Sequence, residues 1–241
     1  MSERIVDRPG LATPGEEAAW NALRDRIAIT LRPLGAPTPI GFLGLAAASL
    51  VLSALQLGWI AQAEGRDVAL VMIGFVFVAQ FVAAIFSFLA RDGTAATAMS
   101  TLALVWLVTG LIMYRSQPGA TSSTLGVFLL FAAVAMALAG LTASMSKLVP
   151  AAVFLVAAVR FGLTAGYHLS AGSGWKVSSG LVGLVLFALA VYAAWASELE
   201  DAAGHTVLPL GRRGKGAIAL RGSLLEQVGE VVHEPGIRQQ L

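Results

Sequence analysis

Long apolar runs, separated by short polar segments, make up most of the chain between its two polar ends. Five of the six runs contain no Asp, Glu, Lys or Arg, and the remaining one contains a single arginine. Each has about 20 residues, the length that an α-helix needs to cross the hydrocarbon core of a bilayer. The pattern predicts an all-α polytopic membrane protein whose six transmembrane helices lie at residues 39–61, 69–89, 94–114, 122–143, 149–169 and 177–197.

A short amphipathic helix is predicted to precede these spans, at about residues 14–31. Its apolar side carries Trp20, Leu23, Ile27 and Leu31, which share one helical face. We expect this helix to lie on the membrane surface. The alternative is a helix that packs against another subunit.

Basic residues predict the orientation of the spans. Of the 16 Lys and Arg residues, twelve lie in the N-terminal segment, the second and fourth connections and the C-terminal tail, and three lie on the other side. Because cytoplasmic segments carry the excess of positive charge, we expect a multi-pass protein of the plasma (inner) membrane with both termini in the cytoplasm. The predicted organisation is a cytoplasmic segment at 1–35, a six-helix domain at 36–211 and a cytoplasmic tail at 212–241.

Composition argues against several functions. Only 12% of the residues are charged and the formal net charge is +2, whereas about a quarter of a typical soluble domain is charged. No basic stripe of the kind that binds nucleic acid is present. The three histidines have no metal-ligand spacing, and every Asp and Glu lies outside the predicted spans. We therefore expect no enzyme activity, no metal, no cofactor and no nucleic-acid partner.

Prolines and glycines interrupt the start of the first span. Gly35, Pro37, Pro39 and Gly41 fall within seven residues. Irregular backbone at membrane depth is tolerated where it is buried in protein or lines a wet cavity. The segment is therefore either the mouth of a pore or an ordinary helix start.

Two motifs resemble those of the acetate uptake transporter family, also called succinate–acetate permeases. The segment Ala36-Pro37-Thr38-Pro39-Ile40-Gly41-Phe42 resembles the family signature Asn-Pro-Ala-Pro-Leu-Gly-Leu, with Ala36 in place of the asparagine. The segment Gly204-His205-Thr206-Val207-Leu208-Pro209-Leu210-Gly211 resembles Gly-Arg-Thr-Val-Leu-Pro-Ile-Gly. A weaker similarity is Ala79-Gln80 followed by Trp106 at the family's spacing.

The resemblance implies a homo-hexamer of six-helix protomers, each with its own path for a small anion. It also implies a narrow apolar constriction formed by one residue each from the first, third and fifth spans. By position these residues are Leu45, Leu102 and Leu163, where the family has an aromatic residue at the first two positions.

Arg160, near the middle of the fifth span, is the most unusual residue of the apolar region. Arg160, Thr164 and Tyr167 follow a helical spacing and share one face. A charge at this depth is costly and should face protein, water or a partner. Arg160 is predicted either to bind an anion in the path, with Gln80 and Ser100 as further polar groups, or to have a structural role in contact with backbone carbonyls or lipid headgroups.

The leading hypothesis is a transmembrane permease or channel for small monocarboxylates such as acetate, in contact with membrane lipid. The sequence is compatible both with a channel that conducts the anion passively and with a transporter that couples its uptake to protons. The alternatives are a non-conducting membrane scaffold or sensor with the same fold, and a permease for another small solute such as ammonia or a different anion.

Overall fold

The structure is a computed structural model that describes residues 34–221, and the predicted amphipathic helix at 14–31 lies outside these residues. Within them, the chain is helical and no strand is present. Its helices are α2 (Thr38–Leu57), α3 (Gly65–Val71), α4 (Phe77–Leu89), α5 (Gly93–Arg115), α6 (Ser123–Ala143), α7 (Leu148–Ser170), α8 (Ser173–Ala203) and α9 (Gly214–Arg221).

Between residues 34 and 221, six helical segments are long and apolar enough to cross a membrane, which confirms the predicted all-α polytopic fold. The second of these segments runs from Gln62 to Leu89 and joins a 3₁₀ turn (Gln62–Glu64), α3, one π-helical segment (Met72–Val76) and α4. Several predicted boundaries differ from the structure, and this second segment begins seven residues earlier than predicted. The first helix ends at Leu57, because Gly58 adopts a left-handed conformation (φ 79°), and α8 is longer than predicted at both ends.

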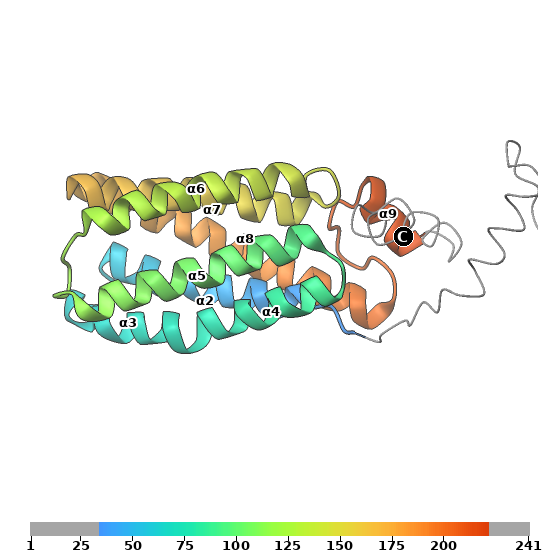
Figure 1. Cartoon of the computed structure of the whole chain (residues 1–241), viewed down its shortest axis with the longest axis horizontal. Helices are drawn as coiled ribbons and strands as arrows, with labels where there is room; N and C mark the ends of the chain where they lie inside the picture. Colours follow the sequence, from blue (N-terminus) through green and yellow to red (C-terminus); the bar gives the residue numbers. More distant parts are fainter. Residues whose placement is uncertain (1–33, 222–241) are drawn as a thin grey trace, which may run out of the picture. The chain divides into compact units, whose positions relative to one another are not determined.

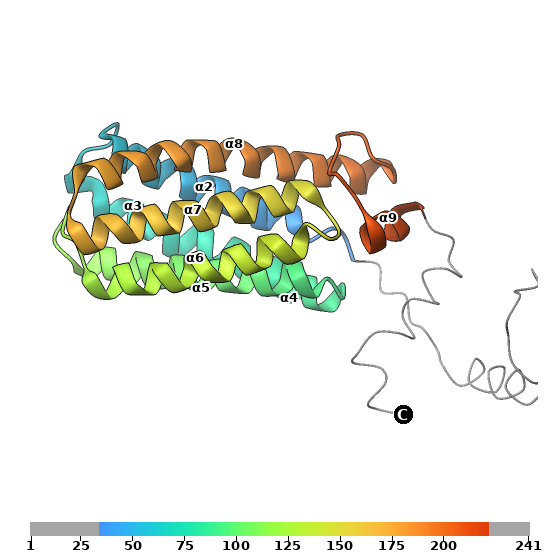
Figure 2. The same cartoon turned by 90° about the horizontal axis from the view of Figure 1, so that it is seen from above.

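The six segments run side by side with alternating direction (Figure 1). Each packs against two neighbours, in the order α2, α4, α5, α6, α7, α8 and back to α2, so the bundle is a closed ring of helices. Seen from above, the helices again run along one another, with α8, α7 and α6 side by side (Figure 2). Helices α2, α5 and α7 alternate around this ring and begin at the same end of it.

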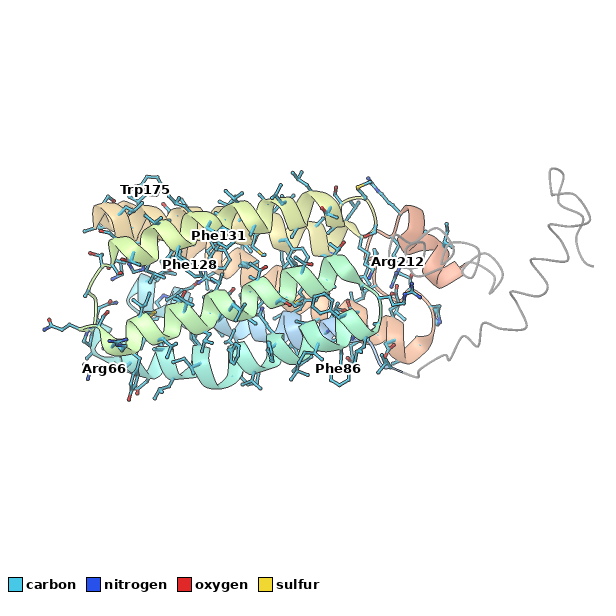
Figure 3. All side chains as sticks on the ribbon, viewed as in Figure 1. Arg66, Phe86, Phe128, Phe131, Trp175 and Arg212 are labelled. Carbon is cyan, nitrogen blue, oxygen red and sulfur yellow. The ribbon has the colours of Figure 1, made fainter. Side chains whose placement is uncertain are left out.

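Apolar side chains also cover the outside of the ring. Phe86 on α4 points away from the bundle (Figure 3), and Phe131 on α6 is 61% exposed. Large exposed apolar residues recur along both helices, as expected for surfaces that face lipid or another subunit.

The start of α2 is an ordinary helix start and not a break within a helix. Pro37 is the N-cap and Pro39 lies in the first turn, where a missing N–H leaves no hydrogen bond unmade. Gly41 permits close packing, because a Cβ atom there would lie 2.6 Å from Sδ of Met99 and 2.9 Å from Cβ of Ala83. Close packing of α2 against α4 and α5 therefore explains the glycine at position 41 of this motif.

The second motif forms a strap, residues 205–213, that folds back onto the start of α7. The N–H groups of Leu148 and Val149 donate to the carbonyls of Gly211 and Leu210, each at 3.1 Å. The next residue, Pro150, has no N–H to satisfy. The strap therefore caps the N-terminus of α7, whose first backbone donors have no partner within the helix.

Candidate functional site

Two cavities lie at opposite ends of the helix ring. The large cavity has a volume of about 390 Å³ and lies where α2, α5 and α7 begin. Phe42, Phe154, Lys147, Glu200 and Arg212 are among its lining residues. Arg212 marks this end of the bundle in Figure 3, and Arg66 marks the other end.

The small cavity has a volume of about 60 Å³ and lies near the C-terminal ends of α2, α5 and α7. Its lining includes Leu52, Thr109, Thr164, Tyr167 and Lys176. The two cavities are therefore lined by the same three helices, with contributions from α6, α8 and the connecting loops.

The inner faces of α2 and α7 connect the cavities. On α2, Phe42 lines the large cavity and Leu52 the small one; on α7, Phe154 lines the large cavity and Thr164 the small one. Ten positions along a helix correspond to about 15 Å. The separation between the cavities is thus about half the thickness of the hydrocarbon core of a bilayer.

Packed apolar side chains close this central segment. Ring centroids lie 6.1 Å apart for Phe42 and Phe154 and 5.5 Å apart for Trp106 and Phe161. Leu45 and Leu102, two of the predicted constriction residues, are fully buried in the same core cluster. Aromatic residues of α2, α5 and α7 thus separate the two cavities.

Leu163, the third predicted constriction residue, has different surroundings. It is half-buried and does not belong to the core cluster. Nine positions separate it from Phe154, which places the two on opposite sides of α7. Phe161, 2% exposed and packed on Trp106, lies on the inner face at this level.

Arg160 lies between the cavities and is 1% exposed. Its Nη1 donates to Oγ of Ser49 at 2.8 Å, and its Nη2 donates to the carbonyl of Ser49 at 3.3 Å. The guanidinium carbon also lies 5.8 Å from the centroid of the Trp106 ring. Arg160 therefore joins α7 to α2 and faces α5.

Thr164 and Tyr167 line the small cavity, on the predicted polar face of α7. Thr164 Oγ1 donates to the carbonyl of Arg160 at 2.8 Å and lies 2.6 Å from Oγ of Ser179 on α8. Tyr167 donates from its hydroxyl to the carbonyl of Gly119 at 3.4 Å. The face of α7 predicted from the sequence is therefore polar from Arg160 to the small cavity.

Gln80 and Ser100 line neither cavity. Gln80 is fully buried between α4 and α2, where its Nε2 donates to the carbonyl of Gly41 at 3.4 Å. Ser100 is half-buried on α5. Neither of these two residues forms a hydrogen bond with Arg160, whose side-chain hydrogen bonds both go to Ser49.

Two ion pairs flank the large cavity. Lys147 Nζ lies 3.1 Å from Oδ2 of Asp92. Arg212 Nε lies 2.9 Å and 3.0 Å from the two carboxylate oxygens of Glu200, and Arg212 Nη2 forms a further short contact with that carboxylate. Arg212 belongs to the strap, so this pair fastens the strap to α8.

Ser49, Ser53 and Gly183 lie beside Arg160, and the sequence analysis did not assign any of them to the path. The sequence does contain a pattern that could have indicated the two serines. Ser49 and Ser53 are four residues apart and therefore share one face of a mostly apolar span. Which helix that face contacts depends on the ring order, which the sequence did not indicate. No group of three His, Asp or Glu residues that could hold a metal occurs within residues 34–221.

Comparisons with known proteins found a matching family and a solved structure with a similar fold. The model of the GPR1/FUN34/yaaH family matches residues 24–210. A solved structure described as that of the bacterial acetate channel SatP is similar, with a TM-score of 0.66 and 24% sequence identity. The similarity covers 74% of this chain and 99% of that chain. No curated protein matches the chain.

Proposed function

The chain belongs to the GPR1/FUN34/yaaH family, and we propose on this premise that it is a channel or permease for small monocarboxylates such as acetate. Membership confirms the resemblance inferred from the two sequence motifs. The family consists of channels and transporters and not of enzymes, as the sequence analysis also expected. The chain is therefore a multi-pass membrane protein of a transport family.

The pair of opposed cavities carries the proposal. They lie on the inner faces of the same helices and are separated by about 15 Å of packed side chains. This is the arrangement expected of a transport path in its closed state. The similar fold of a protein described as an acetate channel favours a small carboxylate as the solute.

The proposed path runs from the small cavity past Thr164, Tyr167 and Arg160 to the large cavity. Its constriction is formed by Leu45 and Leu102 together with the aromatic pairs around them. We assign to Phe161 the position that the sequence analysis gave to Leu163, because Phe161 is on the inner face of α7.

The proposed topology places the large cavity and both termini in the cytoplasm of a cell bounded by the plasma (inner) membrane. The excess of basic residues on this side supports it. Residues 36–211 would form the transport domain, and residues 1–35 and 212–241 its cytoplasmic extensions.

The proposed assembly is a homo-hexamer. Support comes from the family motifs and from the apolar outer surface, where Val127, Phe131 and Val134 of α6 are each at least 60% exposed. Gly162 on α7 also has open space where a side chain would stand, which would allow close approach of a second copy.

Uptake of radiolabelled acetate into proteoliposomes tests the proposal. The experiment compares purified protein with empty liposomes, first without a gradient, then with an imposed pH gradient, and then with an imposed potassium diffusion potential. Acceleration by the pH gradient would indicate a proton-linked permease. Acceleration by the potential alone would indicate an anion channel.

Absence of acetate uptake by folded protein would contradict the proposal. Uptake of ammonia instead would favour a different small solute. Absence of any solute movement would favour the scaffold or sensor alternative.

A further inference from the structure

Arg160 is a buried charge without a counter-ion. It is 1% exposed, and no Asp or Glu within residues 34–221 forms an ion pair with it; the ion pairs of Lys147 with Asp92 and of Arg212 with Glu200 lie at the end of the bundle. A guanidinium remains charged at any physiological pH. Removal of such a charge from water is costly unless an anion or several hydrogen bonds compensate it.

The hydrogen bonds of Arg160 compensate only part of this cost. Both contacts are made to Ser49, one to its hydroxyl and one to its carbonyl, and Nε has no partner. A guanidinium has five N–H donors. Its Nε–H and an adjacent Nη–H form the edge that binds a carboxylate through two parallel hydrogen bonds.

Other donors without a partner lie around the same residue. A Cβ atom on Gly183 of α8 would lie 2.8 Å from Nε of Arg160 and would also collide with Oγ of Ser53. Nε and this hydroxyl therefore both lie against Gly183, in space that a side chain at this position would occupy. Neither Ser53 Oγ nor the indole N–H of Trp106, whose ring faces the guanidinium, has a hydrogen-bond partner.

The position of these groups matches the proposed path. Arg160 lies one helical turn from Thr164, which lines the small cavity, and the two residues are joined by a hydrogen bond. On α2, Ser49 lies between Phe42, which lines the large cavity, and Leu52, which lines the small one. Arg160 and Ser49 thus lie between the two cavities, and Ser53 lies next to Leu52, at the level of the small cavity.

We propose that Arg160, Ser49 and Ser53 form a binding site for the carboxylate group of the transported solute in the middle of the membrane. The inference rests on the proposed transport function and deepens it, since it requires the solute to be ionised when it occupies this site. Gly183 is a positioning residue, because it leaves the space that the guanidinium and the Ser53 hydroxyl occupy.

Direct binding of acetate to the purified full-length protein in nanodiscs, measured by calorimetry, tests this site without relying on transport. Arg160→Leu and Gly183→Ala are each expected to weaken acetate binding at least tenfold. Gly180→Ala is the matched control. It adds the same methyl group one turn away on α8, where it meets side chains of Leu57 and Gln56 and does not touch Arg160. Binding by this control should remain within twofold of the wild type.

Acetamide provides a second readout that does not depend on the folding of a variant. It has nearly the size of acetate but no charge, so it should not displace acetate from the wild-type protein, whereas propionate should. Equal displacement by acetamide and propionate would overturn the inference.

The outcomes separate this inference from the proposed function. If the wild type transports and binds acetate while Arg160→Leu, verified as folded by its elution and melting profiles, binds it equally well, the Arg160 site is wrong and the transport function stands. If Arg160→Leu does not fold, Gly183→Ala and the acetamide competition decide the question. If the wild type neither binds nor transports acetate, both proposals fail.

Discussion

The Nη1 atom of Arg160 lies 2.8 Å from the Oγ atom of Ser49, and this hydrogen bond joins the middle of α7 to the middle of α2 across 111 positions of sequence. Both residues are buried, with exposures of 1% and 0%. The bond thus connects two helices that do not follow one another in the chain. It also holds the guanidinium at the level of the closed segment between the cavities.

Ser49→Ala should lower the free energy of unfolding by about 1–3 kcal/mol, because a buried charged donor loses its partner. In a protein that already carries Arg160→Leu, Ser49→Ala should lower the free energy of unfolding much less, because no guanidinium donor is left without a partner. A double-mutant cycle of unfolding in mixed micelles measures this coupling. Equal costs in the two backgrounds would show that the hydrogen bond contributes nothing.

Gly211→Ala should destabilise the protein more than Gly204→Ala. Both glycines have a positive φ, 66° and 69°, which costs an L-residue about 1–2 kcal/mol. At Gly211 the added Cβ would also lie 2.7 Å from Cβ of Leu148, whereas at Gly204 it would meet nothing within 4 Å. Thermal unfolding compares the two variants.

The same Gly211→Ala variant should increase hydrogen exchange at the amides of Leu148 and Val149. Their hydrogen-bond acceptors belong to the strap, which the variant displaces. Unchanged protection of these amides would show that the strap does not cap α7 in solution.

Arg212→Gln should be more damaging than Lys147→Gln, although each breaks one ion pair. The Glu200 side chain is 5% exposed, so loss of Arg212 leaves a buried carboxylate with the Thr206 hydroxyl as its remaining side-chain donor, at a cost of up to about 3–5 kcal/mol. The side chains of Lys147 and Asp92 are 25% and 35% exposed, and a pair of this kind contributes about 0–1 kcal/mol. Unfolding of both variants, measured side by side, tests this difference. Similar losses would contradict it.

Phe154→Ala should widen the closed segment of the path. Phe154 packs on Phe42 between the two cavities, so its truncation should raise the uptake of butyrate relative to acetate several-fold. Phe131→Ala is the control, because that ring is 61% exposed on the outside of α6 (Figure 3). The ratio of butyrate to acetate uptake in proteoliposomes is the measurement, and an unchanged ratio in Phe154→Ala would place the path elsewhere.

Lys176→Gln should reduce acetate uptake at low ionic strength about two- to tenfold, with a smaller effect at high salt, as expected for electrostatic attraction of an anion. The residues lining the small cavity include Lys176 and no Asp or Glu, whereas Asp92, Glu200 and Asp201 line the large one. Arg66→Gln removes an exposed charge at the same end without altering the cavity lining and should have less effect. Equal reductions of acetate uptake by the two variants would indicate that the overall positive charge of this end attracts the anion, and not Lys176 in particular.

The spans could be predicted from the sequence because hydrocarbon imposes a length and a composition that are readable residue by residue. The charge of Arg160 and the polar face it shares with Thr164 and Tyr167 were readable for the same reason. Local backbone chemistry also carried information, since Pro37 and Pro39 suit the N-cap and the first turn, where the structure places them.

The partners across the bundle were decided by the tertiary structure alone. An apolar helix of roughly uniform hydrophobicity can turn any face toward its neighbours, so the ring order of the helices is not encoded in a local pattern. That order brings Ser49 and Gly183 to Arg160, and Phe42 to Phe154. It also turns Phe161 inward, whereas the resemblance to the family, carried over by position in the fifth span, had indicated Leu163. The sequence by itself determined that a charge lies in the membrane, and packing between distant segments determined what surrounds it.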